Sequence, residues 1–314
     1  MSGEGKVALL FPGQGSQETG MGKDAFESYD DARRVFETAD RALGFSIKKL
    51  CFDGPDEALE LTENTQPAIL TTSIALWKVL RGAGIKPDYV AGHSLGEYSA
   101  LVAAGGLTLP DAVTLVRKRG RYMQDVVPVG VGAMAAILGL SVDDVEAICG
   151  DAAEGQVVEP ANLNGGRQVV IAGHREAVDR ACALAKERGA RRALPLAVSA
   201  PFHCTLMKPA AVELAKDLES TAFSDLEVPL FTNVDAEPIT SGAAARDALV
   251  RQVVSPVRFE AIIEAMASAG VDRFVEVGPR KVLSGLVRKI VKNVETLTVS
   301  SSEGVKRLTE ASVV

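Results

Sequence analysis

The sequence predicts an α/β protein with a large domain built on a parallel sheet and a small ferredoxin-like domain inserted into it. Short apolar runs alternate with segments of helical length in the first 125 residues, which is typical of a parallel sheet covered by helices. The middle of the chain changes to the order βαββαβ, the ferredoxin-like pattern. Apolar runs return in the last third, so the large domain is expected in two pieces.

The first piece of the large domain is predicted from apolar runs and proline positions. Its expected elements are a strand over residues 7–11, a helix over 67–84, a strand over 88–94, and helices over 95–106 and 110–124. A short apolar run bounded by turn residues, such as VALLF before Pro-Gly, is typical of a buried strand. Two of the helices are expected to begin at a proline, Pro67 or Pro110, because the first helical turn does not need the missing N–H.

The small domain is expected over residues 128–198. Its predicted elements, in chain order, are a strand over 132–140, a helix over 141–153, strands over 157–164 and 167–174, a helix over 175–190 and a strand over 191–198. Ser141 has a side chain suited to the N-cap of the first of these helices. The large domain therefore comprises residues 1–127 and 199–314.

The second piece of the large domain is predicted from two further apolar runs. Strands over 228–235 and 272–279 are expected to rejoin the parallel sheet, with helices between and after them. Residues 301–314 (SSEGVKRLTEASVV) are expected to form a weakly ordered tail. Together the two pieces indicate a large domain of the α/β-hydrolase-like class.

The composition excludes several classes of protein. The 314 residues carry a formal net charge of −7, so neither nucleic acid nor an anionic membrane surface is expected as the main partner. No window approaches the roughly 20 apolar residues of a membrane span, and no signal-peptide pattern is present, which predicts a cytoplasmic protein. The four cysteines have no C-x-x-C spacing, so buried free thiols are expected in place of disulfides or a zinc site.

A single serine lies in a pattern that is typical of nucleophiles. Residues 92–96 (GHSLG) match G-x-S-x-G, between a predicted strand and a predicted helix. Glycines on both sides allow the sharp turn that exposes a serine oxygen above the sheet. The same turn places Ser94 at a helix N-terminus, where free N–H groups can bind an oxyanion. The alternative is a structural turn with an incidental serine.

The general base is chosen among only three histidines, His93, His174 and His203. The side chain of His93 is expected to diverge from that of its neighbour Ser94. His174 lies beside a strand end in the predicted small domain, where a surface or capping role is expected. His203 follows a strand end and a proline turn, so elimination favours it as the base. The absence of H-x-H and H-x-x-x-H pairs argues against a metal site.

The glycine-rich loop at residues 11–23 (FPGQGSQETGMGK) matches neither common nucleotide motif. Glu18 stands where the dinucleotide fingerprint needs its third glycine, and Met21 and Gly22 replace the Lys-Ser/Thr pair of a P-loop. The glycines still let backbone N–H groups approach a ligand closely, which suits one half of an oxyanion hole. An ordinary strand-to-helix turn is the alternative.

Taken together, these segments resemble the malonyl-CoA:acyl carrier protein transacylases of bacterial fatty acid synthesis. The matching segments, in the family's order, are 11–17 (FPGQGSQ), 65–69 (TQPAI), 92–101 (GHSLGEYSAL), the Arg-Gly pair within 116–123, 132–137 (GAMAAI), 200–203 (APFH) and 277–283 (VGPRKVL). The resemblance implies that malonyl passes from malonyl-CoA to a phosphopantetheine thiol through a malonyl-serine ester. It also implies the inserted ferredoxin-like domain.

The resemblance implies roles for five residues of the reaction centre. Ser94 would be the nucleophile, and His203 the general base and then the general acid. The backbone N–H groups of Gln14 and Leu95 would form the oxyanion hole. Gln252 matches the residue that orients the histidine from its far side.

Two further residues are implied to recognise the acyl group. Arg119 matches the arginine that pairs with the malonyl carboxylate, and a planar guanidinium can hold a carboxylate bidentately. The sequence alone does not say which of Arg117, Lys118, Arg119 and Arg121 faces the pocket, and a solvated helix charge is the alternative. Phe202 resembles the malonyl-selective form of its motif.

Other functions share part of this evidence. A serine esterase or thioesterase also carries G-x-S-x-G, but an α/β-hydrolase places its histidine near the C-terminus, whereas more than a hundred residues follow His203. A discrete acyltransferase that loads polyketide synthase carrier proteins would use the same chemistry, so the sequence does not separate it. A non-catalytic binding module leaves the coincidence of Ser94, His203 and Arg119 unexplained.

The resemblance also implies the partners, which are malonyl-CoA, CoA and, transiently, acyl carrier protein. The composition and the histidine spacing already argue against nucleic acid, a membrane and a metal, no cofactor is expected, and we expect a monomer. Carrier proteins of this type are acidic, so two basic clusters are candidate docking surfaces: Lys186, Arg188, Arg191 and Arg192, and Arg280 with Lys281. A solvated charged face explains these clusters equally well.

Overall fold

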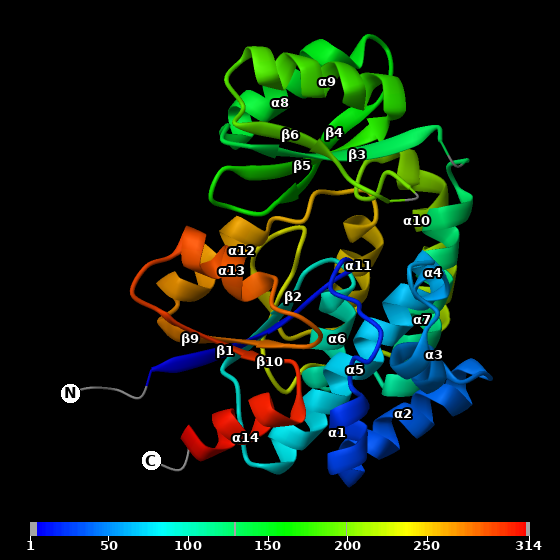
Figure 1. Cartoon of the computed structure of the whole chain (residues 1–314), viewed down its shortest axis with the longest axis vertical. Coiled ribbons are helices and arrows are strands. Elements are labelled where there is room, and N and C mark those ends of the chain that lie inside the picture. Colours follow the sequence, from blue (N-terminus) through cyan, green and yellow to red (C-terminus); the bar gives the residue numbers. More distant parts are fainter. Residues whose placement is uncertain (1–4, 129, 199, 312–314) are drawn as a thin grey trace.

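The computed structural model of the chain describes residues 5–128, 130–198 and 200–311. Figure 1 shows a large lower part, in which helices surround one sheet, and a smaller upper part, in which two helices lie over a second sheet. The predicted α/β class with an inserted βαββαβ unit is confirmed. The domain limits themselves stay a prediction, and residue 199 at one of them lies outside the described residues.

The larger sheet has six strands in the order β10-β9-β1-β2-β7-β8. They are β1 (Lys6–Phe11), β2 (Tyr89–Gly92), β7 (Leu230–Phe231), β8 (Pro238–Ile239), β9 (Val271–Val277) and β10 (Glu295–Val299). All neighbouring pairs are parallel except β7 with the edge strand β8. The central strand β1 therefore ends beside β2, and this edge carries the loop over 11–23 and the turn of Ser94.

Helices cover both faces of the larger sheet. They are α1 (Lys23–Ser28), α2 (Asp30–Leu43), α3 (Ile47–Asp53), α4 (Asp56–Leu59), α5 (Thr62–Gly82), α6 (Gly96–Ala103), α7 (Leu109–Asp125), α10 (Lys208–Ser220), α11 (Gly242–Gln252), α12 (Phe259–Ser268), α13 (Leu283–Ile290) and α14 (Ser302–Ala311), with a 3₁₀ turn over Thr205–Met207. Leu9 and Phe11 of β1 pack in the main core, whereas Ala8 and Leu10 pack against α12 and α13. Strands covered on both faces are expected to be apolar throughout.

The smaller sheet has four antiparallel strands in the order β4-β5-β3-β6. Its elements are β3 (Gly132–Leu138), α8 (Val142–Ala153), β4 (Val158–Leu163), β5 (Gln168–His174), α9 (Arg175–Glu187) and β6 (Arg192–Pro195). Ser141 caps α8 through a reciprocal capping box with Asp144, as predicted. Residues such as Ile171 pack beneath α8 and α9, and alternate residues such as Val170 join the main core.

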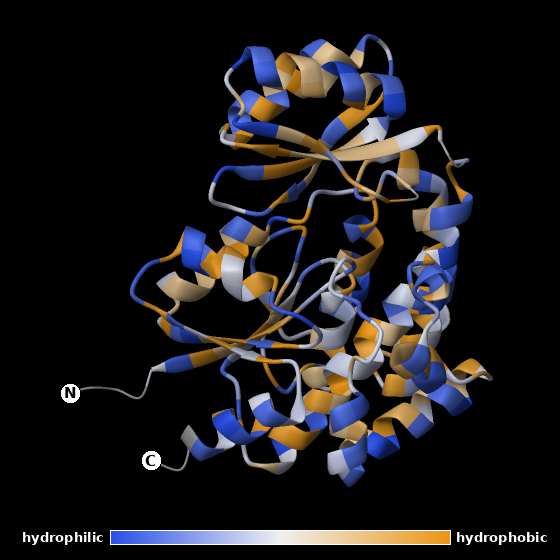
Figure 2. Cartoon of the chain, viewed as in Figure 1, coloured by the Kyte–Doolittle hydropathy of each residue, from blue (hydrophilic) through white to orange (hydrophobic). Residues whose placement is uncertain are grey.

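Figure 2 shows that the helices over both sheets mix hydrophilic and hydrophobic residues, as expected for elements with one face on a core. Among the described residues, no helix is both long enough and apolar enough to span a membrane. The four cysteines are free and buried, as predicted.

The prediction that a helix begins at Pro67 was wrong. Helix α5 begins at Thr62, and Pro67 lies inside it. The preceding turn is held because Thr65 Oγ1 donates to the carbonyl oxygens of Leu59 and Leu61 at 2.6 and 3.0 Å. Pro67 removes only one backbone donor, and the apolar residues that follow it in α5, such as Ile69 and Leu70, are fully buried.

The prediction of a weakly ordered tail over 301–314 was also wrong for residues 302–311. They form α14, whose Val305 and Leu308 are 2 and 5% exposed and pack in the main core. A spacing of three residues places both side chains on one helix face. The backbone N–H of Ser302 donates to Asp24 at 2.6 Å. Residues 312–314 lie outside the described residues.

Candidate active site

Ser94 lies on a tight turn between β2 and α6. Its φ of 52° is left-handed, a conformation that costs energy for a residue with a side chain. The flanking glycines are required by close approach: a Cβ on Gly92 would lie 1.8 Å from the carbonyl carbon of Gly96, and one on Gly96 would lie 1.9 Å from Phe11 O. The serine of G-x-S-x-G therefore lies on the sharp strand-to-helix turn, or elbow, that was predicted.

The structure brings His203 to Ser94. His203 Nε2 lies 2.6 Å from Ser94 Oγ, and His203 Nδ1 lies 2.9 Å from the carbonyl oxygen of Gln252. That carbonyl accepts only, so Nδ1 carries the hydrogen and Nε2 is free to accept from the serine hydroxyl. Burial and the nearby Arg119 charge lower the pKa of His203 to about 3. The imidazole is therefore neutral, and its Nε2 lone pair faces the serine hydroxyl.

Gln252 orients His203 through its backbone, not its side chain. It is the last residue of α11, and carbonyl groups in a last helical turn have no partner inside the helix. The side-chain amide faces the other way. Its Nε2 donates to Ser94 O at 3.0 Å and to Glu97 Oε2 at 2.7 Å, and its Oε1 accepts from Arg119 at 2.9 Å.

Arg119 points into the site and is only 2% exposed. Its Nη2 lies 3.0 Å from Ser94 Oγ, and its Nη1 donates to Gln66 Oε1 at 2.7 Å. Its Nε has no hydrogen-bond partner, and the guanidinium forms no ion pair with any carboxylate of the described residues. Burial lowers the pKa of Arg119, and the carboxylate of Glu97, which acts on it without direct contact, only partly opposes that change. A buried cation that contacts no carboxylate is costly, so the site favours an anion beside Ser94.

The neighbouring cations on α7 point elsewhere, which resolves the ambiguity that the sequence left. Lys118 and Arg121 are exposed and pair with Asp217 and Asp125 at 2.5 and 3.5 Å. The guanidinium of Arg117 lies over the ring of Phe45, 4.1 Å from its centroid. Arg119 is therefore the member of this group that can contact an acyl chain on Ser94.

The loop that carries Gln14 runs directly against the elbow. A Cβ on Gly13 would lie 2.4 Å from His93 O, so only glycine permits this approach. Ser16 Oγ donates to Gly13 O at 2.7 Å and closes the turn. In the described part of the chain, the backbone N–H groups of Gln14 and Leu95 have no hydrogen-bond partner. They are available as donors, although their part in an oxyanion hole stays a prediction.

Comparison with protein families agrees with this geometry. The family described as the acyl transferase domain matches residues 8–311. The chain belongs to the acyl transferase family. Among its relatives, the malonyl CoA-acyl carrier protein transacylase of Bacillus subtilis is 49% identical over 96% of this chain and 95% of its own. That of Escherichia coli K12 is 52% identical over 94% of this chain and 95% of its own.

Solved structures of relatives have the same fold as this acyl transferase. An acyl carrier protein S-malonyltransferase from Vibrio cholerae superposes with a TM-score of 0.95 at 48% identity, over 96% of this chain and 99% of its own. A malonyl-transacylase solved in complex with its type II polyketide acyl-carrier protein has a TM-score of 0.95 at 44% identity, over 98 and 99% of the two chains. The fold class and the resemblance are therefore confirmed.

The other two histidines of this acyl transferase lie away from Ser94 Oγ. His93 Nε2 donates to Asn164 Oδ1 at 2.8 Å, and its ring lies 5.5 Å from that of Phe259. His174 Nδ1 accepts from the backbone N–H of Val157 at 2.9 Å, within the smaller sheet. Both therefore have structural partners. Phe202, beside His203, is buried, and its part in acyl selectivity stays a prediction.

Three residues of the site were missed by the sequence analysis. Gln66 accepts from Arg119, Asn233 Oδ1 accepts from Ser94 N at 2.7 Å, and Glu97 accepts from Gln252. Two signals could have found them. Glu97 is the only charged residue in an otherwise small and apolar helix, and Asn233 follows the end of a parallel strand, where functional residues gather.

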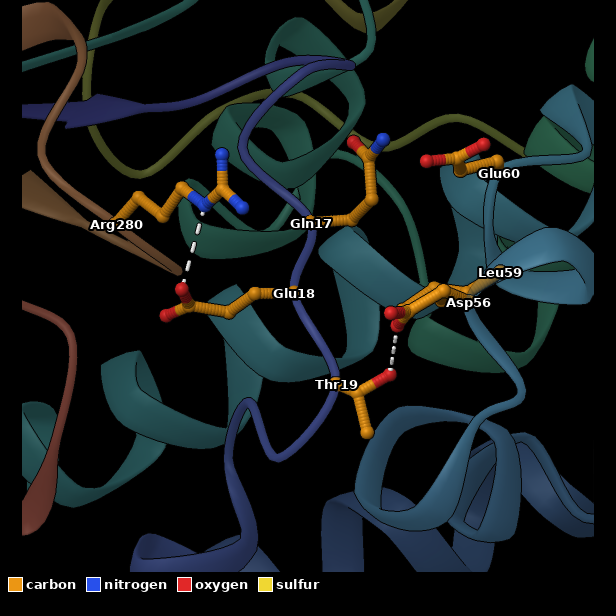
Figure 3. Close-up of a pocket in the computed structure, with 7 residues that line it drawn as sticks. All are labelled: Gln17, Glu18, Thr19, Asp56, Leu59, Glu60 and Arg280. Carbon is orange, nitrogen blue, oxygen red and sulfur yellow. Dashed lines mark hydrogen bonds and ion pairs between the residues drawn. The ribbon is translucent and has the colours of Figure 1, made fainter.

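A surface pocket of about 310 Å³ lies beside the loop of Gln14. Figure 3 shows its lining residues, which are Gln17, Glu18, Thr19, Asp56, Leu59, Glu60 and Arg280. Arg280 Nε lies 3.3 Å from Glu18 Oε2 and forms an ion pair with it, and Thr19 donates to Asp56. With three carboxylates and one paired cation, this pocket does not suit an anionic acyl-CoA.

Proposed function

We propose that this acyl transferase moves the malonyl group from malonyl-CoA to the phosphopantetheine thiol of acyl carrier protein, supplying fatty acid synthesis. The observation that carries the proposal is Arg119, a buried cation that contacts no carboxylate of the described residues and whose Nη2 lies 3.0 Å from Ser94 Oγ. An acyl group with a carboxylate at its far end would supply an anion in direct contact with Arg119 while its thioester carbonyl reaches Ser94. Bidentate pairs between arginine and carboxylate are strong and geometrically specific.

Acylation begins when Ser94 Oγ gives its proton to His203 Nε2 and attacks the thioester carbonyl carbon. The carbonyl oxygen becomes an oxyanion, which the backbone N–H groups of Gln14 and Leu95 are placed to bind. Such donors each contribute about 10²–10³ in rate. The C–S bond then breaks, the CoA sulfur takes the proton from His203, and malonyl remains as an ester on Ser94.

The second half-reaction is the reverse with a different thiol. The phosphopantetheine thiol gives its proton to His203 Nε2, and its sulfur attacks the ester carbonyl. Collapse of the intermediate returns the proton to Ser94 Oγ and leaves malonyl on the carrier protein. This is a ping-pong scheme, and its atoms and electrons balance without a metal, nucleotide or redox cofactor.

The partner proposals extend the resemblance. The protein would act as a monomer in the cytoplasm, with acyl carrier protein as a transient partner. A polyketide carrier protein is the second candidate, since one relative is solved with such a carrier. Of the basic residues suggested for docking, Arg188 and Arg280 already pair with Asp151 and Glu18.

The test is intact-protein mass spectrometry after brief mixing with malonyl-CoA. We expect a gain of one malonyl group on the wild-type protein and none on Ser94→Ala. Addition of holo carrier protein should remove the adduct and transfer it. Steady release of CoA without an adduct or transfer would indicate a thioesterase and contradict the proposal.

A further inference from the structure

Glu97 is a buried carboxylate for which the proposed reaction has no step. It lies in the first turn of α6, directly under the elbow, and is 1% exposed. An isolated buried carboxylate costs several kcal/mol, and Glu97 forms no ion pair with any basic residue of the described chain. Its Oε2 instead accepts two hydrogen bonds, from Asn233 N at 3.1 Å and from Gln252 Nε2 at 2.7 Å.

These contacts fix which way the Gln252 amide points. An ionised carboxylate accepts hydrogen bonds and cannot donate, so the NH₂ of Gln252 must face Glu97 and the carbonyl oxygen of Ser94. The amide oxygen must then face Arg119, which it contacts at 2.9 Å. A reversed amide would place NH₂ against the guanidinium, two donors facing each other, and oxygen against the carboxylate.

The amide oxygen in turn fixes Arg119. Arginine has many side-chain rotamers, and holding one of them requires directional partners. Arg119 has two such partners besides the serine, Gln66 Oε1 on Nη1 and Gln252 Oε1 on Nη2. Glu97 therefore acts on Arg119 through one intervening side chain, and both residues are buried in the same cluster as Ser94.

We propose that Glu97 is a positioning residue for carboxylate recognition: by fixing the polarity of the Gln252 amide, it presents Arg119 to the carboxylate of the acyl group. This inference rests on the proposed function. It predicts that loss of the acceptor at position 97 harms transfer of a charged acyl group far more than transfer of an uncharged one.

The ionisation of Glu97 provides a second test of the same inference. Burial raises the pKa of Glu97 to about 7, although the hydrogen bonds from Gln252 and Asn233 oppose the rise. The charged or titratable groups facing it are Arg119, which lowers its pKa, Asp235, which raises it, and the neighbouring Tyr98. A protonated Glu97 can donate as well as accept, so acidification should weaken the constraint on the amide, which Ser94 O then holds without the charged acceptor.

The experiment measures the rate of Ser94 acylation by malonyl-CoA and by acetyl-CoA, and takes their ratio. The ratio cancels the titration of His203, which serves both substrates. Glu97→Met removes the acceptor at similar volume, and Glu97→Gln, which carries both an acceptor and a donor, imitates the protonated acid at every pH. Ser99→Ala is the matched control, because Ser99 Oγ is buried in the same helix and has no hydrogen-bond partner among the described residues.

We expect Glu97→Met to lower the malonyl-to-acetyl ratio by at least about tenfold, and Glu97→Gln at about pH 8 to give a lowered ratio close to that of wild type at about pH 6. Between about pH 8 and pH 6 the wild-type ratio should fall, and that of Glu97→Gln should not. Ser99→Ala should behave as wild type.

Three results would overturn the inference. They are an unchanged ratio in folded Glu97→Met, a Glu97→Gln ratio equal to that of wild type at about pH 8, and a wild-type ratio that does not change with pH. If Glu97→Met fails to fold, the pH comparison of wild type with Glu97→Gln decides. Failure of the proposed function looks different, since wild-type protein would then form no malonyl ester at all.

Discussion

The two sheets of this acyl transferase differ in what is buried beside them. Next to the larger sheet the structure buries a set of polar and charged side chains that contact one another: Gln66, Glu97, Arg119, His203, Asn233 and Gln252. Within the described residues 130–198, Asn164 is the one buried side chain of this kind. The remaining core of the smaller sheet is apolar. Residues beside the larger sheet are therefore constrained by their hydrogen bonds and charges, whereas residues beside the smaller sheet are constrained mainly by apolar packing.

The smaller sheet still contributes to the site through its edge strand β4. Asn164, just after β4, accepts a hydrogen bond from His93, the residue before Ser94. The backbone of β4 is joined to the large part at Val257, which accepts from Leu163 N at 2.8 Å and donates to Ala161 O at 2.9 Å. The smaller sheet thus contributes one fixed side of the site, whereas the larger part supplies Ser94, His203 and Arg119.

Arg119→Ala should give the largest effect and tests the polar region directly. Removing one partner of a buried charge pair costs about 2–5 kcal/mol, which corresponds to a loss of about 30-fold to several thousandfold in malonyl acylation. Acylation by acetyl-CoA should be kept or should rise, because the buried positive charge beside His203 is gone. Both rates are measured by rapid mixing and mass spectrometry.

Arg121→Ala is the matched control for Arg119→Ala. Arg121 lies on the same helix, is exposed and pairs with Asp125 on the surface, so its removal should leave both rates unchanged. Retention of the malonyl preference in Arg119→Ala would mean that another group binds the carboxylate.

Ile171→Ala tests the apolar region, and its effect should fall on stability. Ile171 is fully buried on β5, and replacing a buried isoleucine with alanine costs about 2–5 kcal/mol in free energy of unfolding, against about 0.5–1.5 for Ile171→Val. Denaturant unfolding measures both. The acylation rate per folded molecule should stay at the wild-type value. A folded Ile171→Ala protein with a slow reaction would show that the core of the smaller sheet also controls the chemistry.

The same contrast explains which parts of the site could be predicted from sequence. Ser94 and His203 were found because an elbow needs glycines at fixed spacing and because histidine is rare in this chain. Arg119 was identified only through the family resemblance, since helix spacing does not say which of several adjacent cations turns inward. The backbone carbonyl of Gln252 leaves no sequence signal, because every residue type carries a carbonyl.

The errors in the fold have a similar origin. Pro67 predicts a helix start by local rules, but the turn before it is held by Thr65 and by burial. Residues 302–311 have a mostly polar composition. They form a helix because Val305 and Leu308 pack into a core that is built by distant parts of the chain. Tertiary contacts determine both the start of α5 and the formation of α14, and local sequence patterns carry no information about such contacts.

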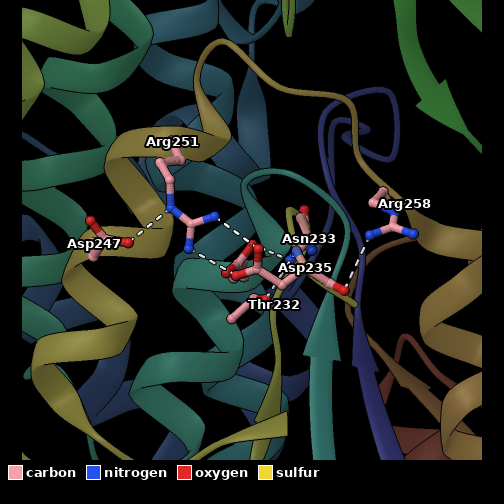
Figure 4. Close-up of polar contacts among 7 residues, drawn as sticks. Thr232, Asn233, Asp235, Asp247, Arg251 and Arg258 are labelled. Atoms are coloured by element: carbon pink, nitrogen blue, oxygen red, sulfur yellow. Dashed lines mark hydrogen bonds and ion pairs between the residues drawn. The ribbon is translucent and has the colours of Figure 1, made fainter. Parts of the chain in front are cut away.

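The smallest effect should come from a surface ion pair that adjoins the polar region without entering it. Figure 4 shows Arg251 between Asp247 and Asp235, and its two Nη atoms contact the two Asp235 oxygens at 2.8 Å each. Asp235 follows Asn233 by two residues, and Arg251 precedes Gln252. The pair thus links the two segments that hold the elbow and His203.

Both side chains of this pair are more than 40% exposed, and exposed pairs contribute about 0.2–1 kcal/mol. Arg251→Ala should therefore lower acylation by malonyl-CoA and acetyl-CoA equally, by less than about fivefold, and added salt should shrink the difference from wild type. Arg273→Ala is the matched control, because it breaks a similarly exposed pair with Glu295. A tenfold or greater loss confined to Arg251→Ala would mean that the buried contacts of Asn233 and Gln252 depend on the surface pair, because those contacts alone should keep the elbow and His203 in place.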